Sequence, residues 1–158
     1  MKVTILVIGK NKKEYISGAL EEYDKRINKY IPFGIQEISG IKGSGKYSEK
    51  EVREKEGQKI LKALPSDASI VLLDERGKQM NSRGFAQWLQ KTMNSGMRKL
   101  VFVIGGAYGF SEVLYEKADM VLSLSKMTFS HQITRIIFAE QLYRAFTIIK
   151  GEPYHHGG

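Results

Sequence analysis

The chain has 158 residues, of which 42% are hydrophobic and 27% charged, and its formal net charge is +8. This length is typical of one soluble domain with a sizeable core, and the absence of cysteine excludes disulfides, thiolate metal sites and cysteine nucleophiles. No signal peptide or apolar run of the ~18 residues that span a membrane is present, so we expect a cytoplasmic protein without a membrane partner. The positive charge favours a polyanionic partner such as nucleic acid, although a solvated basic surface is the alternative.

The first part of the chain predicts two strand–helix pairs. In chain order these are a strand over 3–8, a helix over 14–30, a strand over 33–38 and a helix over 48–64. Pro32 ends the first helix, and Ser48 followed by Glu51 is a capping-box signal for the second. The second helix mixes lysines and arginines with glutamates, Glu56 among them, which predicts an exposed helix with ion pairs.

The second part continues the alternation. We expect a strand over 69–73, a polar turn over 74–78, a helix capped by Asn81 or Ser82, a strand over 100–104, a short helix capped by Ser111, a strand over 120–124 and a helix over 131–150. Strands that alternate with helices throughout predict an α/β fold. Residues 1–158 should form one domain, with a mostly parallel sheet flanked by helices.

Three strand ends carry the residues of a candidate ligand crevice: Leu73, Gly105 and the segment 124–129. In parallel sheets, ligands bind outside the carboxyl ends of the strands. The glycines at 105, 106 and 109 have neither the spacing of a dinucleotide fingerprint nor the lysine of a P-loop. A tight strand-to-helix turn is the alternative interpretation of these glycines. The segment 124–129 adds two hydroxyls and one cation, Lys126, which suits a purine and a thioether better than a polyphosphate.

The last helix is apolar around nearly its whole circumference, which predicts burial on all sides and therefore a homodimer. Central burial within a monomer is the alternative. Arg135 has no acidic residue three or four positions away, so we expect it to contact RNA phosphate or a partner chain. Arg144 is a second RNA-binding candidate, with an ion pair to Glu140 as its alternative.

The C-terminal segment ends in Tyr154 and His155 after Pro153. By its ordinary pKa, His155 is the best candidate for a general base, with solvent as the alternative base. A disordered terminus is the alternative interpretation of the tail. His131, at the start of the last helix, is expected to cap the helix or pack in the core, and a catalytic role is the alternative. Two adjacent histidines without further ligands make a poor metal site, so no metal is expected.

These segments resemble the SPOUT methyltransferases, which have a trefoil knot, and in particular the bacterial family that methylates a pseudouridine of large-subunit ribosomal RNA. The resemblance covers nearly the whole chain, with Ser130 in place of a frequent proline and three extra residues at the C-terminus. It implies a homodimer, a knot over roughly 100–150 and a C-terminal tail, with Tyr154 and His155, beside the cofactor pocket. It also implies S-adenosylmethionine as the cofactor, bound by Leu73, Gly105, Leu124, Ser125, Lys126, Met127, Thr128 and Phe129.

The activity that we expect is therefore methylation of pseudouridine N3 in ribosomal RNA. A small basic dimer without a recognisable RNA-binding module suggests a large structured substrate, the assembled ribosome. The rival hypothesis is a non-catalytic protein that binds RNA or the ribosome. Cofactor binding would separate the two hypotheses.

Overall fold

The computed structural model describes residues 1–157, in which strands and helices alternate. In chain order the elements are β1 (Lys2–Ile8), α1 (Glu14–Ile27), β2 (Phe33–Ile38), the 3-10 turn η1 (Ser44–Lys46), α2 (Glu49–Ala63), β3 (Ala68–Gln79), α3 (Ser82–Asn94), β4 (Lys99–Ile104), α4 (Glu112–Lys117), β5 (Met120–Ser123) and α5 (His131–Ile149). The strands form one five-stranded sheet in the order β2-β1-β4-β3-β5, and every pairing is parallel. The predicted α/β fold is confirmed.

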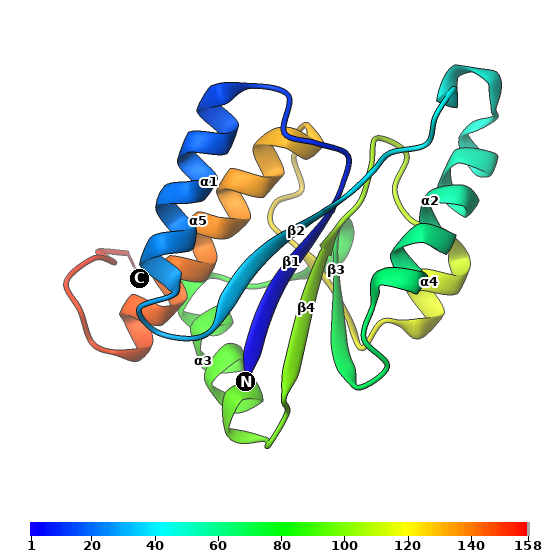
Figure 1. Ribbon diagram of the computed structural model, residues 1–158. Coiled ribbons are helices and arrows are strands. Elements are labelled where there is room, and N and C mark those ends of the chain that lie inside the picture. The colour runs from blue at the N-terminus through cyan, green and yellow to red at the C-terminus, as the bar shows by residue number, and fades with distance from the viewer. Residues whose placement is uncertain (158) are drawn as a thin grey trace.

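Helices cover both faces of the sheet. Helices α1, α3 and α5 lie on one face and α2 and α4 on the other (Figure 1). The central strand β4 is apolar on both faces because it is buried between these two layers. The larger core lies under α5, where the rings of Phe102 and Phe138 pack with their centroids 4.6 Å apart.

Strand β3 differs from its prediction. We expected it to end at Leu73, followed by a polar turn over 74–78, but the strand continues to Gln79. Its pairing with β5 shifts in register, since both Leu73 and Lys78 lie opposite Leu122. Residues 74–77 therefore bulge from the sheet. A Cβ atom at Gly77 would lie 2.6 Å from the backbone of Val121, so the bulge requires glycine at that position.

The helix signals were mostly correct. The capping box of Ser48 and Glu51 is present, and the Asn81 side chain accepts a hydrogen bond from the backbone of Gly84. Ser111 precedes α4 as predicted, but its side chain makes no capping hydrogen bond. The predicted ion pairs along α2 are absent from the part of the chain that the structure describes.

The segment after β5 determines which loops meet at the carboxyl edge of the sheet. Strand β5 is an edge strand beside β3, whereas α5 packs against α1 and α3 on the larger core. Residues 124–130 join the two and pass the carboxyl ends of β3 and β4. The trefoil threading of this region stays a prediction. Within residues 1–157, the helices are all too short or too polar to cross a membrane.

Candidate functional site

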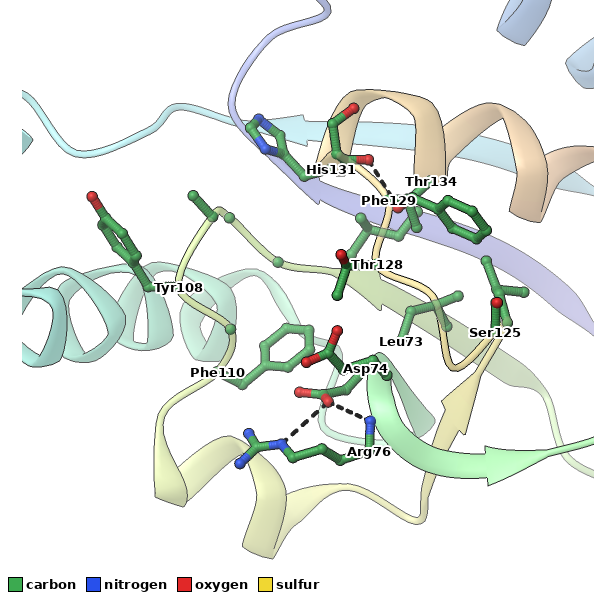
Figure 2. Close-up of a pocket in the computed structure, with 18 of the residues that line it drawn as sticks. Leu73, Asp74, Arg76, Tyr108, Phe110, Ser125, Thr128, Phe129, His131 and Thr134 are labelled. Atoms are coloured by element: carbon green, nitrogen blue, oxygen red, sulfur yellow. Dashed lines mark hydrogen bonds and ion pairs between the residues drawn. The ribbon is translucent and has the colours of Figure 1, made fainter.

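A cavity of about 800 Å³ opens at the carboxyl edge of the sheet. Three segments supply most of its lining: the bulge of β3, the glycine loop after β4 and the segment between β5 and α5. In Figure 2, Asp74 and Arg76 lie on one side of the cavity, His131 and Thr134 lie on the other, and Thr128 lies between them. The three strand ends that the sequence singled out therefore meet in one place.

Seven of the eight predicted cofactor residues line this cavity: Leu73, Gly105, Leu124, Ser125, Met127, Thr128 and Phe129. The eighth, Lys126, is exposed and does not line it, so our expectation of a lysine in the lining was wrong. The charged lining consists of Glu49, Asp74, Glu75 and Arg76.

Hydrogen bonds at both ends fix the segment between β5 and α5. The Ser123 hydroxyl donates to the carbonyl of Ser125 (3.0 Å), and the Ser125 hydroxyl accepts from the backbone of Met127 (3.0 Å). At the other end, the Ser130 hydroxyl accepts from the backbone of Ile133 (3.3 Å) and so caps α5. Ser130 thus supplies a cap to the helix that follows the cavity.

The glycine loop is a tight turn closed by a hydrogen bond from the amide of Gly109 to the carbonyl of Gly106 (3.4 Å). Gly109 has φ +80°, which favours glycine. A Cβ atom at Gly105 would lie 2.9 Å from the ring of Phe110. The turn interpretation and the crevice interpretation of these glycines thus both hold, because the turn forms a wall of the cavity.

Glu56, on α2, supports the glycine loop from behind. A Cβ atom at Gly106 would lie 2.5 Å from the Glu56 carboxylate. Glu56 is buried, with 8% of its surface exposed. The Glu56 Oε1 atom has no hydrogen-bond partner within the described residues, and burial raises the pKa of this carboxyl above its ordinary value of 4.5. We had assigned Glu56 to an exposed charged face. No local signal separates it from its neighbours, since only the packing of α2 on the loop buries it.

Replacing Glu56 with glutamine is expected to raise the melting temperature at pH 7 to 8 and to change it little near pH 4. Because the folded state raises this pKa, the stability that the protonated acid contributes is complete below pH 4.5 and is lost as the pH rises through the folded value. Glutamine resembles the neutral acid at every pH. In thermal melts, the melting temperature should rise by about 2–4 °C for each kcal/mol by which the variant avoids the cost of burying the charged carboxylate. An equal gain at both pH values would contradict this account.

Asp74 is the centre of a polar network on the cavity wall. Its carboxylate accepts hydrogen bonds from the Tyr115 hydroxyl and from the backbone of Arg76 (2.9 Å), while the Arg76 guanidinium donates to the Tyr115 oxygen (2.7 Å). Burial alone would raise the pKa of Asp74, but these hydrogen bonds and the Arg76 charge outweigh burial and lower it. Asp74 is therefore ionised at neutral pH. The sequence placed Asp74 at the crevice, but Tyr115, 41 residues away, could not be linked to it from local pattern.

Across the cavity, His131 is half-buried in the first turn of α5. Burial, followed by the nearby charges of Arg135 and Lys12, lowers its pKa below the ordinary 6.5. Its imidazole is therefore neutral at pH 7. Our expectation that His131 would cap the helix or pack in the core was wrong, since it lines the cavity and Ser130 provides the cap.

The cavity suits a cationic or neutral organic ligand better than a polyphosphate. Three of its four charged side chains are acidic, and Arg76 is already paired with Asp74. The remaining lining combines apolar side chains with the hydroxyls of Ser125 and Thr128. No group of three potential metal-ligating residues occurs between residues 1 and 157.

Arg135 does not have the role predicted for it. The side chain is fully buried (0% exposed) and donates to the carbonyl of Ile8 (2.7 Å) and to Asn11 Oδ1 (2.7 Å). Because the guanidinium is fully buried, it cannot contact an RNA phosphate. The sequence suggested an external partner because Arg135 lacks an acidic neighbour on its own helix, whereas its partners lie more than 120 residues away.

Arg144 and the C-terminal tail form a separate cluster. Arg144 pairs with Glu140 on α5 (2.5 Å), as the alternative interpretation held, and lies over the ring of Tyr154 (4.8 Å). The Tyr154 hydroxyl donates to Glu140 (3.1 Å), and Arg144 Nη1 contacts His155 Nδ1 (3.3 Å). Neither tail residue lines the large cavity. His155 instead borders a cavity of about 300 Å³, which shares Leu122 and Leu124 with the large one.

Comparison with known proteins agrees with this geometry. A family model described as predicted SPOUT methyltransferase matches residues 1–155. This chain is similar to proteins named ribosomal RNA large subunit methyltransferase H. Its sequence identity is 51% to the protein of Parabacteroides distasonis, 48% to that of Geotalea daltonii and 47% to that of Christiangramia forsetii. Each alignment covers 99% of this chain and at least 99% of the relative. The chain therefore belongs to the SPOUT methyltransferase family.

Proposed function

We propose that this protein transfers a methyl group from S-adenosylmethionine to N3 of a pseudouridine in large-subunit ribosomal RNA. The main support for the proposal is the cavity, which is lined by all three predicted crevice segments. In addition, the relatives that match the full length of the chain are named as methyltransferases of that RNA. We further propose the assembled ribosome in the cytoplasm as the substrate.

The cofactor would lie in the large cavity. Leu73, Leu124 and Phe129 offer apolar contacts, the loop at Gly105 offers backbone groups, and Thr128 offers a hydroxyl. The acidic side chains of the lining complement the positive sulfonium. When bound, S-adenosylmethionine supplies an electrophilic methyl group for in-line substitution. The chain's own residues then have to orient the donor and the acceptor and exclude water.

Exposed apolar side chains at the cavity suit a nucleotide acceptor. Tyr108 is 45% exposed at the tip of the glycine loop, and Met127 and Phe129 are 76% and 41% exposed on the opposite segment. Enzymes that modify an RNA base commonly stack it on aromatic side chains. Tyr108 and Phe129 can therefore receive the base on either side of the cavity.

The homodimer is part of the proposal. Helix α5 packs its inner side on the core, while Ile133 and Ile137 lie on its outer side and are exposed and half-buried, respectively. Glu140 and Arg144, which hold the tail, lie on the same helix. A dimer formed through α5 would cover these isoleucines and place Tyr154 and His155 beside the interface. We propose both tail residues as catalytic, and Arg144 as an RNA contact at its partly exposed edge.

The acceptor N3 must lose its proton, and His155 is the proposed base. His155→Ala is expected to lower turnover at neutral pH, with partial recovery at higher pH as the imide ionises by itself. His156→Ala, which removes the neighbouring exposed imidazole, is the matched control and should match the wild type. Rates across pH 6 to 10 on ribosomes measure this effect. A wild-type rate and pH profile for His155→Ala would exclude His155 as the base.

The test of the proposal is methyl transfer from labelled S-adenosylmethionine to free ribosomal RNA, isolated large subunits and whole ribosomes. We expect cofactor binding by calorimetry and label incorporation that is greatest with whole ribosomes. A protein that binds RNA but neither binds the cofactor nor transfers the label would support the non-catalytic alternative.

A further inference from the structure

The loop between β1 and α1 carries three exposed lysines, Lys10, Lys12 and Lys13, which we call the lysine loop. It leaves β1 at the carboxyl edge of the sheet, through Gly9 with φ +84°. Tyr15 follows on the first turn of α1 and is 64% exposed. Cations beside an exposed aromatic ring are the combination that single-stranded nucleic acid favours, because lysines contact phosphates and the ring stacks on a base.

Four hydrogen bonds from the beginning of α5 hold this loop. Arg135 donates to Ile8 and Asn11, and the Gln132 amide donates to the carbonyl of Lys10 (3.1 Å) and accepts from the amide of Lys12 (3.2 Å). The buried Arg135 and the part-buried Gln132 thus connect the backbone of the loop to the helix turn that contains His131. The loop is a fixed part of the cavity surroundings, and its lysine side chains are not needed to hold it.

The lysines of the loop are also free of ion pairs within residues 1–157. Glu37 accepts a hydrogen bond from the Asn11 side-chain amide (3.2 Å), and Glu14 is exposed at the start of α1. The lysines and arginines of α2, by contrast, are interspersed with four glutamates along the helix. The charge of Lys12 reaches the cavity, since it contributes to the lowered pKa of His131.

We propose that the lysine loop binds phosphates of the RNA strand next to the nucleotide that enters the cavity. This inference rests on the proposed function, because it assigns an RNA-binding surface to the same site. It replaces Arg135 as an RNA contact and gives that residue a positioning role, since Arg135 holds the loop whose lysines meet the RNA. The supporting geometry is the fixed loop, its unpaired lysines and its attachment to the helix turn at the cavity.

The test compares two double variants of the full-length protein that remove the same charge. Lys12→Ala/Lys13→Ala changes the loop, whereas Lys25→Ala/Lys29→Ala removes two exposed, unpaired lysines at the opposite end of α1. Methylation of ribosomes is measured at saturating S-adenosylmethionine over a range of salt concentrations, and cofactor affinity is measured by calorimetry without RNA.

For the loop variant, we expect a rise of about tenfold in KM for ribosomes and a salt dependence shallower by about one unit of slope per lysine. Cofactor affinity should stay at the wild-type value, and the control variant should change KM less than about twofold. An unchanged KM and slope in the loop variant, or an equal loss in the control, would overturn the inference. Failure of the wild type itself to methylate any RNA would instead refute the proposed function.

Discussion

Valine in place of Gly105 is expected to weaken binding of S-adenosylmethionine by about 10- to 100-fold. The new side chain would overlap the Phe110 ring, since a Cβ atom alone lies 2.9 Å from it, and the loop or the ring, which both line the cavity, would have to move. Overpacking of this kind costs about 1–3 kcal/mol, and each 1.4 kcal/mol is about a tenfold change in affinity. Calorimetry on the purified variant measures the loss, and circular dichroism checks that the fold survives.

A second pair of variants separates the two possible causes of that loss. Gly105→Ala introduces only the Cβ atom, and Phe110→Leu removes the ring that this atom would meet. If the collision with Phe110 displaces the loop, Gly105→Ala/Phe110→Leu should bind the cofactor more tightly than Gly105→Ala alone. If backbone contact at Gly105 is what the cofactor needs, the double variant should bind no better than the single one. Wild-type affinity in Gly105→Val would refute the pocket assignment.

If the proposed dimer forms through α5, glutamate in place of Ile137 is expected to convert it to monomers and to abolish methylation of ribosomes. Ile137 lies on the outer side of α5, where a second subunit would bury the new charge without a partner at a cost of several kcal/mol. Sedimentation at the concentration of the activity assay measures assembly. Val113→Glu adds the same charge at a residue that is 55% exposed on α4, and it should leave both properties intact. An active dimer of Ile137→Glu would show that this helix face is not the interface.

The sequence predicted those elements of the fold whose pattern is local. Residues 100–104 are apolar at every position because helices cover both faces of β4, and this continuous pattern identifies a central parallel strand. The extension of β3 was not predictable in this way. Its polar residues 74–77 resemble a turn, and they remain in the strand because Gly77 meets the backbone of Val121.

In the candidate site, too, the features with a local sequence pattern were predicted and those that depend on distant contacts were not. The crevice at Leu73, Gly105 and residues 124–129 followed from strand ends in a parallel sheet, and seven of its eight residues line one cavity. Arg135 and Glu56 were misassigned because their burial depends on contacts between distant segments. Arg135 meets a loop 124 residues earlier, and Glu56 meets the glycine loop across the helix–sheet interface. Charged side chains inside a helix look alike in sequence whether such a contact exists or not.

The identity of the nucleotide that the protein methylates tests the proposed function most directly. Ribosomes lacking the modification are incubated with the protein and S-adenosylmethionine, the large-subunit RNA is digested to nucleosides, and the products are analysed by mass spectrometry. We expect one new methyl group per large subunit, at N3 of a pseudouridine, and its loss when Gly105→Val replaces the wild type. A methyl group on a different nucleotide, or none on any RNA while the cofactor binds, would contradict the proposed function.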